Sequence, residues 1–476
     1  MVFGVYPADT TVPDDGEIPR RAWRALAVGC AGFSLMSFNT TAMNLAFGDI
    51  ADDFSGASQA TVSWVASVFF IGMASLMLLS GGLADRLGRR RMYRLGLVTF
   101  AAGATLSAVA PTVYVLIGAR LLASVGGALV VPSSLAVILP EFPKHRHFTA
   151  VALWSATGPV ASTIAPTAAA AILSFASWRV LLAVSAPIAL VALLSSFGTL
   201  QESKGQRSSA RIDLVGVLLG SSAIAALVFA VSQGPNLGWV HPLVIGTLAA
   251  ATTLLPLFVL SCRRHDDPLL NLDLFLLKPV WVANLANMFL NLPGLGVWIL
   301  WPLFMDRVWG YSKIQIGLGL LPGPIVSGIL TSISGRLADR MGPHRLLRWS
   351  AMIPLLALAW PLFTLTEEPN YWLSAGPCIG LFGAGWALTQ PTLNSSVLSH
   401  VSADFYGEVN AAFNTIRNVA GALGIAIAIA IVGDPDRANP MAAYGRAFAA
   451  FAVAGLACWA LLVFVFPRPT AAAAGD

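Results

Sequence analysis

Long, uninterrupted runs of apolar residues constrain the fold of this chain more than any other feature. A helix needs about 20 apolar residues to cross the hydrocarbon core of a membrane. Only 11% of the 476 residues are charged, against about 25% in soluble proteins, so a soluble body of this size would lack the charge to cover its surface. The sequence therefore predicts an all-α polytopic membrane protein with fourteen spans, at residues 22–47, 60–82, 92–110, 112–139, 148–174, 178–199, 214–233, 241–262, 280–305, 314–337, 346–366, 371–399, 407–432 and 444–466.

The basic residues predict how these helices are oriented. If the N-terminus is cytoplasmic, 21 of the 28 Lys and Arg residues fall on the cytoplasmic side, five on the outer side and two within spans. Cytoplasmic loops carry this excess in membrane proteins. We therefore expect both termini in the cytoplasm, and the net charge of +5 needs no nucleic-acid partner. Residues 1–20 lack the order of a secretory signal, so the first helix is expected to be retained.

An internal repeat predicts the organisation of the chain. Residues 81–91 read GGLADRLGRRR between the second and third spans, and residues 335–342 read GRLADRMG between the tenth and eleventh. The offset is eight helices, whereas a duplicated six-helix unit would give six, so two helices are inserted between the copies. The expected units are a cytoplasmic tail (1–21), a six-helix half (22–199), a linker with two inserted helices (200–279), a second six-helix half (280–466) and a C-terminal tail (467–476).

The repeated loop has the composition of a charged latch between helices. Gly81 and Gly335 allow helices to approach closely, and Gly88 and Gly342 suit a tight turn. Asp85 and Asp339 can accept backbone N–H groups at a helix start or pair with arginines. An Arg-rich inner loop is common in membrane proteins, but two copies in equivalent positions favour a latch, whose remaining expected members are Arg86, Arg89, Arg90 and Arg340.

With these motifs the chain resembles the major facilitator superfamily, and in particular its fourteen-helix drug:proton antiporter branch. The repeated GxLADRxGRRR loop is the signature of that superfamily. Further elements that resemble the branch are RLLASVGGA from Arg120, SWR at 177–179, RIDLVG at 211–216, SQGP at 232–235 with GW at 238–239, and DPLL at 267–270. The resemblance implies a monomeric secondary transporter that exports small molecules through the lipid bilayer, with protons as a possible coupling ion.

Three departures from the family pattern bear on the mechanism. Asn39 stands where the family has an acidic residue in its first span. In the fifth span the family element GPxxGG reads APTAAA at residues 165–170, so that the helix-bending Pro166 is kept and three glycines are alanines. Ala123 and Ser124 replace the usual Gln-Gly in the fourth span. The first departure removes a titratable group, and the second is expected to stiffen a helix that packs closely.

No carboxylate or imidazole is expected in the bilayer interior, because every Asp, Glu and His falls in a tail, a loop or a helix end. Proton-coupled carriers normally keep such a group. Asp306, at the outer end of the ninth span, is the second candidate for coupling, although it also fits an ordinary helix-end charge. Asn39 and Arg120 lie at similar depth and can face each other. Arg120 either couples or binds substrate there, or is neutralised by backbone carbonyls and hydroxyls such as that of Ser124.

Polar side chains form a stripe on the ninth span. Asn284, Asn287, Asn291 and Trp298 fall within an arc of about 60° at 100° per residue. Amides avoid lipid, so these residues either line a central cavity, the alternative that we favour, or bond to neighbouring helices. Gln390 and Asn394 in the twelfth span are further cavity candidates. Asn410, Asn414 and Arg417 form a similar stripe in the thirteenth span, for which a structural network is the expected role.

The sequence thus predicts an exporter of apolar or amphipathic small molecules, similar to drug and antibiotic efflux proteins, that works by alternating access. An uncoupled facilitator, or an exporter of an endogenous lipid, siderophore or metabolite, is the main alternative. A membrane enzyme is remote, because acids and nucleophiles do not cluster. An ATP-driven pump would need a GxxxxGK[ST] loop, which is absent. The four scattered cysteines predict no metal site and no cofactor, and 24 Arg against 4 Lys favours a bacterial plasma membrane.

Overall fold

The computed structural model describes residues 18–57, 59–202, 213–265, 268, 270–432 and 440–467. These residues are helical almost throughout and contain no strand. The helices of the first part of the chain are α1 (Arg20–Asp53), α2 (Gln59–Leu87), α3 (Arg89–Ala108), α4 (Val113–Ile138), η1 (Leu139–Glu141), η2 (Lys144–Arg146), α5 (His147–Phe175), α6 (Trp178–Ala183), α7 (Ser185–Thr199), α8 (Leu214–Leu237) and α9 (Pro242–Arg264).

The second part of the chain follows the same plan, with more interrupted helices. Its elements are α10 (Leu272–Leu276), α11 (Lys278–Arg307), α12 (Lys313–Leu320), α13 (Pro322–Met341), α14 (Pro343–Ser350), α15 (Met352–Ala359), α16 (Pro361–Thr364), α17 (Ala375–Leu398), η3 (Ala403–Phe405), α18 (Tyr406–Val432), α19 (Pro440–Ala460) and the π-helical turn η4 (Leu461–Val465). Proline lacks the N–H that would continue a helix, and Pro322 and Pro361 each open a new segment.

Apart from a few residues at the ends, each of the fourteen expected spans coincides with one helix or with a run of consecutive helices. Within the described ranges, eight segments are long and apolar enough to cross a membrane, and α2, bent by 51° between residues 67–77 and 79–87, is a ninth. Residues 215–231 of α8 form a shorter apolar helix over the described residues. In α17, Ala, Gly, Ser and Thr are frequent where other spans carry larger aliphatic residues.

Side chains at several helix starts fix where the helices begin. The Thr112 hydroxyl accepts a hydrogen bond from the backbone N–H of Val115 at the start of α4, and Asp213 accepts one from Gly216 at the start of α8. These bonds satisfy backbone donors that a helix leaves unpaired in its first turn. These two caps thus set where α4 and α8 begin.

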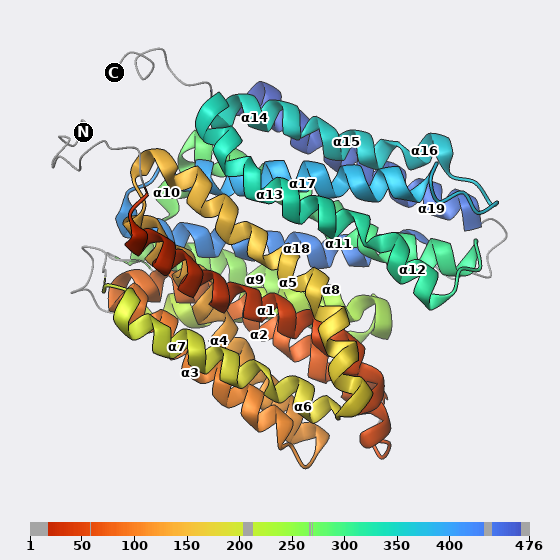
Figure 1. Ribbon diagram of the computed structural model, residues 1–476, viewed down its shortest axis with the longest axis horizontal. Coiled ribbons are helices and arrows are strands. Elements are labelled where there is room, and N and C mark those ends of the chain that lie inside the picture. Colours follow the sequence, from red (N-terminus) through yellow and green to blue (C-terminus); the bar gives the residue numbers. More distant parts are fainter. Residues whose placement is uncertain are drawn as a thin grey trace.

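The helices pack into two groups with an inserted pair beside them (Figure 1). The first group, α1–α7, holds α3 against α4 and α1 against α5. The second group, α11–α19 with η4, holds α11 against α18 and α13 against α17. The pair α8–α9 packs on itself, and α8 also contacts α2 and α18. The inserted pair therefore lies where the two groups meet.

The main contacts between the groups are those of α2 with α18 and of α5 with α13, and α5 with α17 and α4 with α18 add smaller ones. The closest approaches lie at one end, where a methyl group on Gly81 would overlap the Gly407 carbonyl and one on Gly335 would overlap the backbone of Thr149. We call this the latch end. It is at the left in Figure 1, and the ribbons of the two groups diverge toward the other end. Helix α1 begins, and η4 ends, at the latch end.

Candidate functional site

The carboxylate of Asp85 joins the two groups at the latch end. Its Oδ2 accepts a hydrogen bond from the backbone N–H of Glu408 at 2.9 Å, and its Oδ1 accepts one from that of Gly407 at 3.3 Å. Both donors lie in the first turn of α18, where unpaired N–H groups favour an anion. Asp85 is 5% exposed, so this contact between the groups is shielded from water.

Arg89 completes the contact around Asp85. Its Nε and Nη2 lie 2.9 and 2.8 Å from Asp85 Oδ1, and both side chains are buried. The Arg89 guanidinium also lies 5.9 Å from the ring centroid of Tyr406, the first residue of α18. Removing one member of a buried ion pair leaves the other charge uncompensated. Loss of either Asp85 or Arg89 would therefore also disturb the contact with the start of α18.

The second copy of the loop makes a matching contact. Asp339, at the end of α13, accepts a hydrogen bond from the Thr149 hydroxyl in the first turn of α5. The positive charge of Arg146 lies nearby. The other oxygen, Asp339 Oδ1, is buried without a hydrogen-bond partner among the described residues. The two acids thus face the starts of α18 and α5, each across the boundary between the groups, and the first contact is the more complete.

The remaining expected latch residues hold turns and connections. Gly88 and Gly342 adopt φ of 111° and 82°, a region that favours glycine. Arg90 donates to the Leu200 carbonyl and, through its backbone N–H, to Glu202 at 3.1 Å. Arg86 donates to the Pro268 carbonyl at 2.8 Å. Arg340 is exposed. Arg86 and Arg90 therefore tie the loop to neighbouring connections, and Arg89 pairs with the latch acid.

Sequence reasoning missed Glu408, a buried acid in the first turn of α18. Its Oε1 accepts a hydrogen bond from the backbone N–H of Asn271, in the segment that leads from the inserted pair into α10 and α11. Together with the bond from Arg86 to Pro268, this ties the segment to both sides of the latch. The sequence marked Glu408 only as a helix-end acid, and its burial depends on a contact 137 residues away.

Asn39 and Arg120 meet inside the first group. Arg120 Nη1 donates to Asn39 Oδ1 at 2.7 Å, and its Nε donates to the Val65 carbonyl at 3.2 Å. The guanidinium lies 4.4 Å from the ring centroid of Phe69. Both Asn39 and Arg120 are 2% exposed. An amide, a carbonyl and an aromatic face thus hold this cation, with no carboxylate among its described partners.

Two hydroxyl groups near Asn39 and Arg120 have different hydrogen-bond partners. Asn39 Nδ2 contacts Ser185 Oγ at 3.4 Å, which brings α7 into the cluster. The Ser124 hydroxyl, the expected neutralising group, instead donates to the Leu121 carbonyl of its own helix. Ser124 therefore does not help to balance the charge of Arg120.

The amides of α11 join a network between three helices of the second group. Asn291 Nδ2 donates to Gln390 Oε1 at 2.9 Å, and Gln390 Nε2 donates to Asn287 Oδ1 at 2.9 Å. Trp386 Nε1 donates to Asn291 Oδ1, and Asn287 Nδ2 donates to the Phe413 carbonyl of α18 at 2.8 Å. Asn287 is fully buried. The structure thus places these amides in bonds to neighbouring helices, the alternative to lining a cavity.

The other polar candidates are less fully paired. Asn394 Nδ2 donates to Asn410 Oδ1 at 3.2 Å, and Asn414 Nδ2 donates to the same oxygen. Asn284 donates to the Val280 carbonyl of its own helix. The carbonyl oxygens of Asn284, Asn394 and Asn414 are buried and have no partner among the residues described. Trp298 is half-buried, and its ring faces Gly323 of α13.

Asp306 and the ion pair of Arg179 with Asp53 lie away from these clusters. Asp306 is exposed at the end of α11, and the side chain of Pro166 lies outside the described residues. Near the end opposite the latch, Arg179 bonds to Asp53 and holds the pKa of that carboxyl below its usual range. Residues 1–17, 203–212, 267, 269 and 468–476, which include most of both tails and half of the motif at 267–270, lie outside the described residues. Among the described residues, no group of three His, Cys, Asp or Glu residues could hold a metal.

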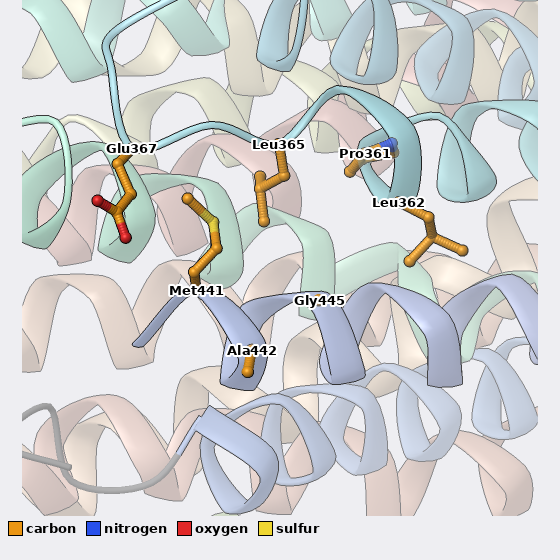
Figure 2. A pocket seen from close by; sticks show the side chains of 7 residues that line it. All are labelled: Pro361, Leu362, Leu365, Glu367, Met441, Ala442 and Gly445. Atoms are coloured by element: carbon orange, nitrogen blue, oxygen red, sulfur yellow. The ribbon is translucent and has the colours of Figure 1, made fainter. Parts of the chain in front are cut away.

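A groove of about 470 Å³ lies near the end opposite the latch, between α16 with its following connection and the start of α19 (Figure 2). Its walls are largely aliphatic, and Glu367 stands at one side. The lining residues are Pro361, Leu362, Leu365, Glu367, Met441, Ala442 and Gly445. None of them belongs to the latch or to the amide network, so the groove is separate from both.

Comparisons with known proteins agree with this architecture. The model of the Major Facilitator Superfamily matches residues 28–425. The chain is 28% identical to the methylenomycin A resistance protein of Bacillus subtilis over 92% of this chain and 94% of that one. It is 27% identical to the methylenomycin A resistance protein of Streptomyces coelicolor, over 90% of each chain. It is also 28% identical to the multidrug resistance protein Stp of Mycobacterium tuberculosis, over 83% of this chain and 73% of that one.

Solved structures share the fold at low identity. The human organic anion transporter MFSD10 (TETRAN) superposes with a TM-score of 0.66 at 16% identity, covering 93% of this chain and all of that one. The proton:xylose symporter XylE superposes with a TM-score of 0.65 at 15% identity, covering 94% of this chain and 96% of that one. With a family match over most of its length, a helical membrane-spanning architecture and transporters rather than enzymes as relatives, this chain belongs to the major facilitator superfamily of membrane transporters.

Proposed function

We propose that this protein exports apolar or amphipathic small molecules of the antibiotic type by alternating access. The relatives named for methylenomycin A and multidrug resistance support this function. The observation that carries the mechanism is the pair of matching contacts between the groups, Asp85 with the start of α18 and Asp339 with the start of α5. A carrier must close one end reversibly, and charged contacts at helix starts provide a closure that can be released.

We infer that the latch end is cytoplasmic and that the protein lies in the plasma membrane of a bacterium, with both termini in the cytoplasm. The excess of Lys and Arg on that side supports this orientation, and so do the bacterial relatives. The arrangement is then outward-facing, closed toward the cytoplasm. We propose two six-helix halves, 22–199 and 280–466, with residues 200–279 as the inserted part, acting as a monomer; the two groups of packed helices support this division.

Coupling is the second part of the proposal. Arg120 is held by Asn39, whose amide does not titrate, so the cluster keeps one positive charge across physiological pH. We propose that protons do not couple through this position. A proton-coupled cycle would need another acid, and Asp306 and Glu408 are the two to test. An uncoupled facilitator is the second candidate function, favoured because no acid among the described residues bonds to Arg120.

The experiment is drug export in a sensitive bacterial host and in inverted membrane vesicles. We expect the unmodified protein to raise resistance to some members of a panel of antibiotics and dyes and to speed their uptake into the vesicles. A double variant, Asp85→Asn with Asp339→Asn, is the inactive reference. Asp49→Asn is the matched control, because Asp49 is exposed and away from the latch. Equal uptake with the unmodified protein and the double variant, at equal expression, would contradict the proposal.

Collapsing the pH gradient in the same vesicles separates the two candidates. If accumulation against a concentration gradient persists only while the proton gradient is present, coupling runs through a group other than Asn39. If flux follows the substrate gradient alone, the facilitator is correct.

A further inference from the structure

Arg417 is a cation in the middle of α18, the twelfth of its 27 residues. The faces of this helix are occupied by other helices. Gly407 and Ala411 lie against Gly81 of α2, and Gly424 lies against the Leu292 carbonyl of α11. Ala412 belongs to the same apolar cluster as Ile224 and Val228 of α8. Asn410, Asn414 and Arg417 share a stripe between the residues that face α2 and those that face α11. Arg417 therefore points to the boundary between the two groups and not to lipid.

No described residue forms a hydrogen bond, an ion pair or a ring contact with the Arg417 guanidinium. The side chain is nevertheless only partly exposed. By contrast, the Arg120 guanidinium contacts an amide, a backbone carbonyl and an aromatic ring. An arginine in a membrane interior is costly unless something balances its charge, and such residues mark ligand or ion pathways. Described neighbours thus hold the guanidinium of Arg120, whereas no described neighbour bonds to that of Arg417.

The surroundings of Arg417 are polar on one side and apolar on the other. The bond from Asn287 to the Phe413 carbonyl aligns α11 with α18. One turn further along each helix lie Asn291, with its bond from Trp386, and Arg417. On the side of the first group, the neighbouring residue Asn418 contacts Met77 of α2. Methionine side chains adapt to apolar ligands of different shapes.

Polar atoms without partners continue along the same stripe toward the latch. Asn414 Oδ1 and Asn410 Nδ2 are buried, and neither has a hydrogen-bond partner in the described chain. These two residues lie one and two turns from Arg417. A buried polar atom that stays unpaired costs free energy, which a bound ligand or water recovers. The stripe therefore has the features of a surface that takes a polar group.

We propose that Arg417 binds the acidic group of an amphipathic substrate, a carboxylate or another singly charged oxyanion, whose apolar part lies toward Met77 of α2. A guanidinium offers a planar pair of N–H donors that match a carboxylate. Binding at this boundary engages both groups of helices at once. The inference rests on the proposed transport function and adds to it the class of substrate.

The test compares acids with uncharged analogues of the same shape. The probes are 1-naphthylacetate, 4-phenylbutyrate and decanoate, each paired with its primary amide. Binding to the purified full-length protein is measured by quenching of tryptophan fluorescence. We expect at least one acid to bind about tenfold more tightly than its amide. Arg417→Gln should remove this preference by weakening the acid and leaving the amide unchanged, and Arg417→Lys should keep part of it.

Arg345→Gln is the matched control, because it removes an exposed arginine outside the stripe, and it should keep the preference. The proposal is overturned if the unmodified protein shows no preference for the acid in any of the three pairs, a result that needs no variant to fold. It is also overturned if Arg417→Gln weakens acid and amide equally. Because binding is measured without transport, a failure of drug export would count against the proposed function alone.

Discussion

The Asp85 carboxylate accepts a hydrogen bond from the backbone N–H of Glu408, a residue 323 positions away in the other group of helices. The side chain of the same Glu408 accepts a bond from Asn271, just beyond the inserted pair. Glu408 thus bonds both to Asp85 and to the segment that leads into the second group. Opening the latch end must break the first contact, and it changes the surroundings of the second.

We predict that Asp85→Asn lowers transport by about tenfold or more and that Asp339→Asn has a smaller effect. Asp85 accepts two backbone N–H groups and pairs with buried Arg89, whereas Asp339 bonds to Thr149 and keeps an unpaired oxygen in the described chain. The amide keeps the shape and removes the charge. Initial rates in vesicles, corrected for expression, are the measurement. Equal effects of the two substitutions would show that the second copy matters as much as the first.

We predict that Gly81→Ala opens the latch end. The added methyl group would overlap the Gly407 carbonyl and the Ala411 side chain, and such overlap costs about 1–3 kcal/mol, which lowers the closed population about 5- to 150-fold relative to the open one. Spin labels at Arg91 and Arg336, both exposed on different groups, should report longer distances in a background without the native cysteines. Gly118→Ala is the control, because nothing lies near that position. An unchanged distance distribution for Gly81→Ala would refute the prediction.

We predict that the unmodified protein moves few protons with its substrate and that Asn39→Asp changes this. The new carboxylate would lie beside Arg120, where Asn39 Oδ1 now accepts a bond at 2.7 Å. The neighbouring cation would hold its pKa low, so the gain in coupling is expected to be small at neutral pH and larger in acid. Substrate-driven proton movement in proteoliposomes is the readout. A stoichiometric proton countercurrent in the unmodified protein would assign coupling to another residue, with Asp306 the first to replace.

We predict that Asn287→Leu destabilises the protein by about 1–3 kcal/mol, the cost of leaving buried polar partners unpaired. The substitution removes the bond to the Phe413 carbonyl and the acceptor of Gln390. Thermal unfolding in detergent measures the loss. Thr252→Leu, at an exposed position of α9 whose hydroxyl bonds only within its own helix, should change it little. Unchanged stability together with altered substrate preference would mean that Asn287 lines a cavity.

The sequence was a good guide to the helices and to residues within one half. Apolar runs predicted the spans, and the depth of Asn39 and Arg120 predicted that they could meet, because both follow from counting residues along helices. The partners of Asp85 could not be predicted, since they depend on how two distant groups dock. The surroundings of Arg417 could not be predicted either, and its motif favoured a structural network with Asn410 and Asn414. Asn410 and Asn414 do bond to each other, and Arg417 does not join them.

The closed latch end also raises the concentration that a compound must reach before the protein binds it from that side. A ligand that enters only when this end is open shows its intrinsic dissociation constant divided by the fraction of open molecules. The contacts of Asp85 and Gly81 reduce that fraction, although neither residue needs to touch the ligand. Substitutions there would lower the threshold concentration for every compound by the same factor, whereas substitutions at a binding residue would change the order of preference among compounds.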